Sequence, residues 1–427
     1  MKKYTELSKE ELLVLKNELS AEYDEAKAKG LKLDMSRGKP SPYQLDVEMD
    51  FATVMEGVTD YSAEDGTDCR NYGVLTGLPE ARKLFGDMMG VPAANVMIYG
   101  NSSLNIMYDN ILRSMQFGVL GSTPWCKLDK VKWLCPAPGY DRHFAITEQM
   151  GIEMITIPMN ADGPDMDLVE KYVENDPAVK GIWCIPKYSN PTGYTCSDET
   201  VRRMAALKPA AEDFRIYWDN AYAVHDLYED KSDCLLEILS ECQKAGNPNM
   251  VYEFCSTSKI TFPGAGVAAL ITSEENIESL KKYLTIQTIG HDKINQLRHV
   301  KFFKDAEGVR KQMLRHAEVL RPKFEMVDTM FADGLGDLGI GSWTKPNGGY
   351  FVSFDAMPGC AKAIVAKCAE AGVKLTGAGA TYPYKKDPMD VNIRIAPSYP
   401  STEELKAAAE LFVLCVKLVS VEKLLEE

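Results

Sequence analysis

Between about residue 50 and residue 295, short apolar runs alternate with amphipathic stretches that are long enough to form helices. Such short runs fit buried strands, and helix-length connections between successive strands make those strands parallel. The chain contains seven of these runs: Val96–Tyr99, Val131–Cys135, Met154–Pro158, Gly181–Ile185, Arg215–Trp218, Met250–Cys255 and Val267–Ile271. The pattern predicts an α/β fold with a mainly parallel, seven-stranded sheet that has helices on both faces.

The two ends of the chain have other patterns. Near the N-terminus, a capping box at Ser8 and Glu11 opens a helix, and an irregular arm with two prolines follows at Ser36–Pro42. After about Asn295, a long amphipathic stretch precedes short strands and helices. Because 427 residues are too many for one compact domain, we expect two domains. Residues 46–295 would form the large domain and residues 296–427 a small α+β domain, which residues 1–45 join as an N-terminal helix and arm.

Three charged residues lie at or in predicted strands. Lys259 follows a strand that ends in hydroxyl residues, Asp219 directly follows the Arg215–Trp218 run, and Arg394 lies between apolar neighbours. A lysine amine can form a Schiff base with an aldehyde, a carboxylate can keep a pyridine nitrogen protonated, and an arginine can pair with an α-carboxylate. Each residue alone has an ordinary structural explanation. Together they predict a site for pyridoxal 5′-phosphate (PLP), with Lys259 as the Schiff-base lysine.

Other residues at predicted strand ends would complete this site, because ligands of parallel sheets bind at the carboxyl ends of the strands. Asn101, Ser102 and Ser103 precede an apolar helical stretch, and a helix N-terminus with hydroxyls suits a phosphate. Tyr140 could stack on the cofactor ring. The residues predicted to bind the cofactor are Lys259, Asn101, Ser102, Ser103, Tyr140, Asn190, Asp219, Tyr222, Ser256 and Ser258, and the predicted catalytic residues are Lys259, Asp219 and Tyr222.

Composition argues against several other classes of protein. The formal net charge of -14 disfavours binding to nucleic acid or to an anionic membrane surface. No run approaches membrane-spanning length, and no signal peptide is recognisable at the start. The eleven cysteines lack metal-ligand spacing, and histidines number only five. We therefore expect a cytoplasmic protein with reduced thiols and no metal, nucleic-acid or membrane partner.

At these residues the sequence resembles the class I/II aminotransferases of PLP fold type I. The motifs that carry the resemblance are Asn190-Pro-Thr-Gly, Asp219-x-x-Tyr222, Ser256-x-Ser258-Lys259 and the late Arg394. The Ser-Thr-Ser-Lys-Ile-Thr run and the Gly-Ala-Gly after it are similar to a divergent aspartate aminotransferase subgroup, called type Ic and grouped with the MocR-like aminotransferases. The resemblance implies an aminotransferase whose substrates are small amino acids and 2-oxo acids, with L-aspartate and 2-oxoglutarate as the pair.

Further assignments rest on the resemblance alone. Tyr72 looks like the tyrosine that is lent to the neighbouring subunit's phosphate site, which implies a homodimer with shared active sites. His143 matches a histidine that supports the aspartate on the pyridine nitrogen. Gly38 resembles a glycine beside the substrate, and the expected substrate-binding set is Arg394, Gly38 and Asn190. The family's arginine shortly after the lysine is missing from Phe262–Gly266, so the mode of phosphate binding stays open.

Substrate specificity and reaction type also stay open. No spacing selects the cation that would meet a distal substrate carboxylate among Arg37, Lys39, Arg70, Arg142 and Arg298. An aminotransferase for alanine or aromatic amino acids, or a PLP-dependent β-lyase or decarboxylase, would use the same lysine. A PLP-sensing transcription regulator needs a DNA-binding domain ahead of the PLP domain. We set it aside because only about forty residues precede the large domain and the chain is acidic.

Overall fold

In the computed structural model, which describes residues 2–426, all seven predicted runs form strands of one large sheet. These strands are β2 (Val96–Ile98), β3 (Lys132–Ala137), β4 (Glu153–Asn160), β6 (Val179–Cys184), β7 (Arg215–Asp219), β8 (Val251–Ser256) and β9 (Ala268–Ile271). A two-residue strand, β5 (Gly163–Pro164), extends the sheet to eight strands in the order β2-β9-β8-β7-β6-β3-β4-β5. Strands β4, β3, β6, β7 and β8 are parallel, whereas β9, β2 and β5 pair antiparallel. The predicted mainly parallel α/β fold is confirmed.

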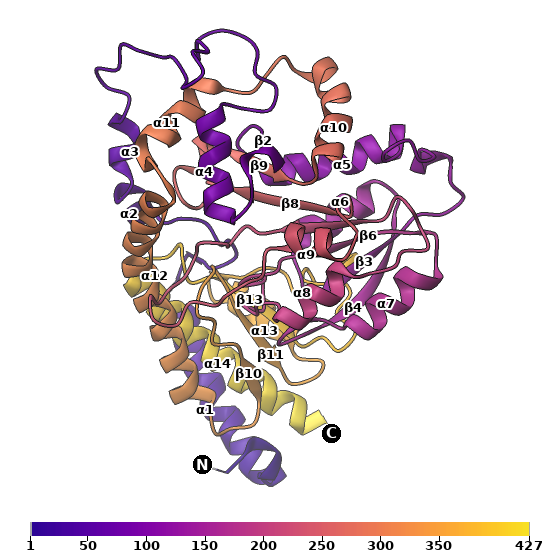
Figure 1. The fold of residues 1–427 in the computed structure, drawn as a ribbon. Helices are drawn as coiled ribbons and strands as arrows, with labels where there is room; N and C mark the ends of the chain where they lie inside the picture. Colours follow the sequence, from indigo (N-terminus) through magenta and orange to yellow (C-terminus); the bar gives the residue numbers. More distant parts are fainter. Residues whose placement is uncertain (1, 427) are drawn as a thin grey trace.

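Helices cover both faces of this sheet, as predicted (Figure 1). They are α4 (Pro79–Met89), α5 (Ser103–Phe117), α6 (Asp141–Gln149), α7 (Met166–Asn175), α8 (Asp198–Ala205), α9 (Ile238–Lys244), α10 (Glu274–Gln287) and α11 (Lys293–Phe303). Side chains of the central strand β7 alternate between the two faces. Ile216 and Trp218 pack in one core with Val201 of α8, and Tyr217 packs in the other core against Trp133. The sheet is therefore buried on both sides.

The C-terminal part contains an antiparallel sheet in the order β10-β11-β13. Its elements are β10 (Gly341–Trp343), β11 (Val352–Ala356), β12 (Val373–Lys374), β13 (Asn392–Ile395), α12 (Ala306–Leu335), α13 (Ala361–Glu370) and α14 (Thr402–Glu426). The N-terminal segment joins this part through β1 (Leu33–Asp34), which pairs with β12, and through α1 (Lys9–Ala28), which packs against α14 (Figure 1). The domain boundaries near residues 45 and 295 stay predictions.

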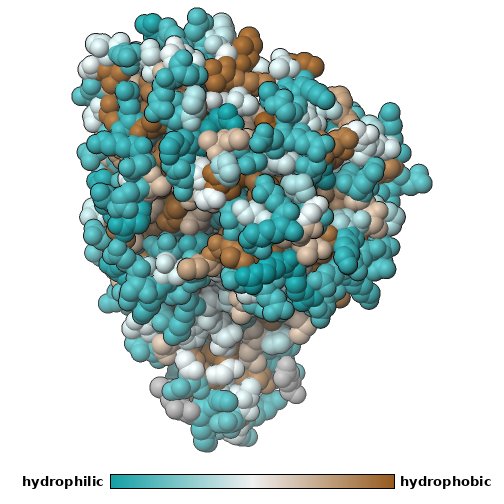
Figure 2. Space-filling model, in the orientation of Figure 1, coloured by the Kyte–Doolittle hydropathy of each residue, from teal (hydrophilic) through white to brown (hydrophobic). Residues whose placement is uncertain are grey.

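Shorter helices occupy the connections. They are α2 (Pro42–Asp46), α3 (Met49–Thr53) and the 3₁₀ turns η1 (Tyr4–Glu6), η2 (Ala93–Asn95), η3 (Trp125–Lys127), η4 (Pro263–Ala265) and η5 (Pro383–Lys385). Hydrophilic residues cover most of the face seen in Figure 2, where hydrophobic residues form only small separate patches. Among the helices of residues 2–426, none combines the length and apolar character needed to cross a membrane.

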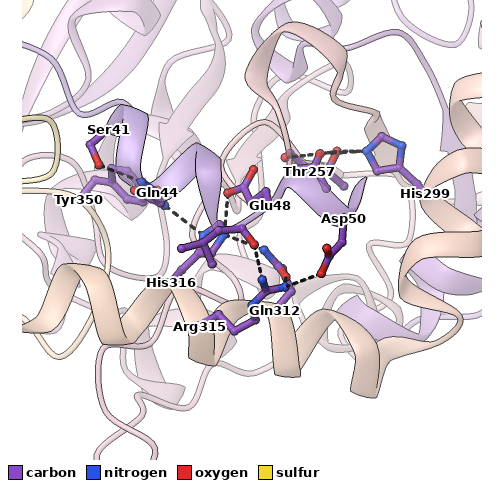
Figure 3. A network of polar contacts seen from close by, with 12 residues as sticks. Ser41, Gln44, Glu48, Asp50, Thr257, His299, Gln312, Arg315, His316 and Tyr350 are labelled. Atoms are coloured by element: carbon purple, nitrogen blue, oxygen red, sulfur yellow. Dashed lines mark hydrogen bonds and ion pairs between the residues drawn. The ribbon is translucent and has the colours of Figure 1, made fainter. Parts of the chain in front are cut away.

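A buried polar cluster fixes α2 against α12 (Figure 3). The side-chain amide of Gln44 donates to Tyr350 Oη at 2.7 Å and lies 3.0 Å from His316 Nδ1. His316 Nε2 lies 2.6 Å from Glu48 Oε1, and both side chains are almost completely buried. Burial raises the pKa of Glu48 above its ordinary value. The cluster anchors the segment that directly follows the Ser36–Pro42 arm.

Candidate functional site

A cavity of about 590 Å³ lies at the carboxyl ends of the parallel strands. Of the residues that the sequence predicted for the site, it is lined by Gly38, Ser102, Ser103, Tyr140, Asn190, Asp219, Tyr222, Ser256, Ser258, Lys259 and Arg394. Asn101 and Tyr72 do not line it. Residues of the N-terminal arm, of β13 and of the segments at the ends of β2, β3, β6, β7 and β8 thus meet in one place.

Asp219, the last residue of β7, is held by one oxygen and has the other free. Its Oδ2 lies 2.9 Å from His143 Nε2, and the imidazole of His143 stacks on Trp183 with a centroid distance of 4.3 Å. Its Oδ1 is buried and has no hydrogen-bond partner among the residues that the structure describes. A buried carboxylate oxygen requires a donor. The N–H of a protonated pyridine ring in the cavity would satisfy it, so this residue fits PLP.

Lys259 lies in the turn after β8 and is half-buried. Its ammonium nitrogen is 5.1 Å from the centroid of the Tyr222 ring. Burial lowers the pKa of Lys259, and attraction to Asp219 opposes this effect without cancelling it. A lower pKa increases the fraction of neutral amine, which is the form that can attack an aldehyde. Burial also raises the pKa of Tyr222, so its phenol stays protonated and can donate a hydrogen bond.

The N-terminus of α5 forms another wall of the cavity. Ser102 caps this helix, because its hydroxyl oxygen accepts a hydrogen bond from the backbone N–H of Asn105. The first-turn N–H groups of a helix attract anions. Ser256 and Ser258 add hydroxyls on the same cavity. Ser258 Oγ donates to the Asn101 carbonyl at 2.9 Å, so Asn101 lies directly behind the wall. This end of the cavity fits a phosphate group.

Arg394, on β13, is only 7% exposed and makes polar contacts with residues of three separate segments. Its Nη1 donates to Asp141 Oδ1 at 2.8 Å and to Asn190 Oδ1 at 3.3 Å, and its Nη2 donates to Thr376 Oγ1 at 3.2 Å. Its guanidinium also lies 5.0 Å from the centroid of the Phe351 ring. Asp141 and Thr376 were not foreseen from the sequence. Its Nε is buried without a hydrogen-bond partner among the described residues, so the guanidinium keeps a donor for a substrate carboxylate.

The structure separates the five candidate cations for a distal carboxylate. Arg37, Lys39 and Arg142 line the cavity, whereas Arg70 is paired with Asp68 outside it and Arg298 lines a neighbouring cavity. Lys39 lies 3.9 Å from the centroid of the Tyr399 ring. Lys374 also lines the cavity, and sequence reasoning missed it because nothing local links β12 to the site. Among residues 2–426, no ion-pair partner is found for Arg37, Arg142 or Lys374.

The turn that carries Lys259 is fixed by a buried histidine of α11 (Figure 3). His299 Nδ1 donates to the Asn295 carbonyl at 2.8 Å, so its Nε2 is left to accept from the hydroxyls of Thr257, at 2.9 Å, and Thr261, at 3.0 Å. Burial lowers the pKa of His299 to about 4. The imidazole is therefore neutral at pH 7, and this network was not predicted from the sequence.

Acid should weaken the fold through His299. Its pKa is about 4 in the folded chain and about 6.5 in the unfolded chain, so the unfolded state binds more protons between these values. Neutral His299 makes its full contribution to the free energy of unfolding above pH 6.5. This contribution is lost as pH falls toward 4, and the loss is about 3 kcal/mol at most. Denaturant titrations at pH 7 and pH 4.5 should show a smaller loss in His299→Gln than in the unsubstituted protein. Equal losses in the two proteins would contradict this assignment.

Comparison with known proteins gives a consistent set of relatives. The model of the family described as aspartate amino-transferase matches residues 7–427. A putative aminotransferase of Mycolicibacterium smegmatis is 48% identical over 99% of both chains. An aspartate aminotransferase of Corynebacterium glutamicum is 48% identical over 95% of this chain and 93% of its own length.

The solved structures that resemble this chain are aminotransferases as well. The crystal structure of an aspartate transaminase from Corynebacterium glutamicum has a TM-score of 0.96 with this chain, at 46% identity, and covers 99% of both chains. The α-aminoadipate aminotransferase of Thermus thermophilus, complexed with N-(5′-phosphopyridoxyl)-L-leucine, has a TM-score of 0.72 at 20% identity, over 92% of this chain and 95% of its own. The latter likeness concerns the fold alone.

Proposed function

The chain belongs to the aspartate amino-transferase family, and from this we propose that it binds PLP through Lys259 and transfers the amino group of L-aspartate to 2-oxoglutarate. The family shows that the chain is an aminotransferase, and we infer the substrate pair. The observation that carries the proposal is the free, buried Oδ1 of Asp219 in the same cavity as Lys259 and Arg394. Membership of the type Ic subgroup is part of the proposal.

When bound, PLP supplies an electron-accepting ring that stabilises negative charge on the substrate's α-carbon. Lys259 would hold the cofactor and, once released, move the proton between the α-carbon and the cofactor carbon that receives the amino group. Asp219 would accept the pyridine N–H, with His143 fixing the orientation of the carboxylate. Tyr222 and Asn190 would donate to the ring oxygen, and Tyr140 would cover the ring face.

The phosphate would lie at the N-terminus of α5. Ser102 and Ser103 would bind it through amides and hydroxyls, Ser256 would add a hydroxyl from the end of β8, and Ser258 would contact it from the turn before Lys259. Asn101, whose carbonyl accepts from Ser258, would act from behind this wall by fixing the position of that serine.

The substrate would be held at its two ends. Arg394 would bind the α-carboxylate in place of Asp141, and Asn190 would contact the same group. Gly38 packs on the Phe351 ring so closely that a Cβ at position 38 would lie 2.3 Å from the ring, so only glycine allows the arm to approach. The arm thereby brings Arg37 to the cavity, where a cation can meet a distal carboxylate.

A shared active site in a cytoplasmic homodimer is also part of the proposal. Tyr72 is 81% exposed in the single chain, as is suitable for a residue that enters a neighbouring subunit. Lys293 Nζ donates to the Gly73 carbonyl at 3.0 Å, which joins this segment to the one that carries Ile289, 61% exposed. Exposed apolar side chains on neighbouring segments favour an interface. A single-chain mass in sedimentation equilibrium would contradict it.

The substrate proposal predicts a clear order of amino donors with 2-oxoglutarate. L-aspartate should exceed alanine and tyrosine in kcat/KM by at least about tenfold, because about 1.4 kcal/mol of discrimination by a distal cation gives that ratio. Glutamate, aspartate, alanine and tyrosine should be compared in the unsubstituted protein, in Arg37→Ala and Lys39→Ala, and in Lys171→Ala as an exposed control on α7.

The outcomes separate the alternatives. A lead for alanine or tyrosine would refute the dicarboxylate preference and leave the aminotransferase assignment intact. Formation of alanine and carbon dioxide from aspartate, instead of oxaloacetate, would replace transamination by decarboxylation. Release of a β-substituent from a suitable amino acid would identify a β-lyase.

A further inference from the structure

In the described part of the chain, the phosphate end of the cavity has no cation besides Lys259, which is assigned to the cofactor's aldehyde. A phosphate monoester carries a charge of about −1.5 to −2 at pH 7, and a helix N-terminus supplies only about half of a positive charge. The other groups on this wall, Ser102, Ser103, Ser256 and Ser258, are neutral. The segment that follows Lys259, from Phe262 to Gly266, also contains no cation.

A smaller cavity, of about 330 Å³, adjoins this end. Asn101 lines the smaller cavity and Ser258 lines the larger one, and the hydrogen bond between these two residues joins their walls. The cation-free segment borders the smaller cavity through Gly264 and Gly266. A Cβ at Gly264 would meet no atom within 4 Å, so the space beside it is open.

One face of α11 is directed at the same segment. Asn295, Arg298 and His299 are spaced by three and four residues and therefore share a helix face. Asn295 Nδ2 donates to the carbonyls of Ala265, at 2.9 Å, and Gly266, at 3.1 Å. His299 holds the Lys259 turn through two threonine hydroxyls (Figure 3). Arg298, between these two anchors, lines the smaller cavity.

Among residues 2–426, Arg298 has no ion-pair partner that would neutralise its charge. Its Nε is buried without a hydrogen-bond acceptor in the described part of the chain. The guanidinium lies 5.5 Å from the centroid of the Phe51 ring. Asp292, which also lines the smaller cavity, caps α11 by accepting from the backbone N–H of Asn295 at 2.9 Å. A buried guanidinium N–H requires an acceptor, and phosphate oxygens match its geometry.

We propose that Arg298 supplies the positive charge that binds the phosphate of PLP, and that it does so from α11 and from the side of the smaller cavity. It would take the place of a cation on the segment after Lys259. This inference rests on the proposed function, because it assumes that PLP is the cofactor. It also explains why a glycine-containing segment without cations can border the phosphate end.

Titration of the cofactor-free protein with PLP and with pyridoxal, which lacks the phosphate, tests the inference. Arg298→Gln should weaken PLP binding by at least about tenfold, since hydrogen bonds to a charged group contribute on that scale, and should change pyridoxal binding less than about twofold. Arg298→Lys should keep part of the PLP affinity. Arg202→Gln, an exposed arginine of α8, is the matched control and should bind both compounds normally.

The same measurements can overturn the inference. PLP binding to Arg298→Gln at the unsubstituted affinity would refute it, and so would a loss of PLP and pyridoxal affinity in equal ratio, which would indicate general damage to the site. Failure of the unsubstituted protein to bind PLP would refute the proposed function and the inference with it. Normal PLP binding by that protein, with no effect of Arg298→Gln, would refute the inference alone.

Discussion

Replacing Lys259 by alanine is expected to lower kcat for amino transfer by at least about 10⁴-fold. The residue has two proposed tasks, to hold the cofactor and to move the proton at the substrate's α-carbon, and positioned acid–base groups alone contribute about 10² to 10⁴. Burial already lowers the pKa of this amine and favours its reactive neutral form. Lys259→Arg should be equally inactive, because a guanidinium stays protonated in proteins.

Whether Lys259 is the lysine that binds the cofactor can be tested independently of the reaction rate. Borohydride treatment of the PLP-loaded protein should fix the cofactor to a single peptide, and that peptide should contain Lys259. Lys259→Ala should give no labelled peptide, whereas Lys171→Ala, on an exposed position of α7, should label and react as the unsubstituted protein does. A labelled peptide that lacks Lys259, or substantial activity in Lys259→Ala, would refute the assignment.

The large sheet could be predicted because its strands are buried on both faces. Each strand then appears in the sequence as a continuous apolar run, as in β7, where Ile216, Tyr217 and Trp218 alternate between two cores. β5 escaped prediction because Gly163 and Pro164 carry no apolar pattern. The pairing of β1 with β12 escaped it because Leu33 and Val373 are far apart in the sequence and only the tertiary fold brings them together.

The part of the site that lies at strand ends could be predicted from the sequence. Asp219 and Ser256 end their strands, and the turn that carries Lys259 follows β8, so the parallel sheet brings them together at one edge. Contacts between separate elements carry no such signal. The pairing of Arg394 with Asp141 joins β13 to α6. The hydrogen bonds that His299 accepts from the threonine hydroxyls of the Lys259 turn join α11 to that turn in the same way.

Loss of the Asp219 charge should slow the reaction by roughly a hundredfold or more. The carboxylate would keep the cofactor's ring nitrogen protonated, and a buried, positioned charge partner of this kind contributes several kcal/mol to the transition state. Asp219→Asn is the informative variant, because it keeps the volume and can still face His143 while removing the charge. Asp219→Ala should show a similar or larger loss, since it also leaves the buried imidazole of His143 without its partner.

The effect should fall on proton removal more than on cofactor binding. Exchange of the substrate's α-proton with deuterated solvent, followed by NMR, should slow by the same factor as amino transfer, while absorbance shows that PLP is still bound. Asp129→Asn, at an exposed position, should exchange at the unsubstituted rate. If Asp219→Asn exchanges the α-proton within a few-fold of that rate, the carboxylate does not tune the ring. Its free Oδ1 would then need another partner. The proposed orientation of the cofactor, which has the ring nitrogen toward β7 and the phosphate toward α5, would also be wrong.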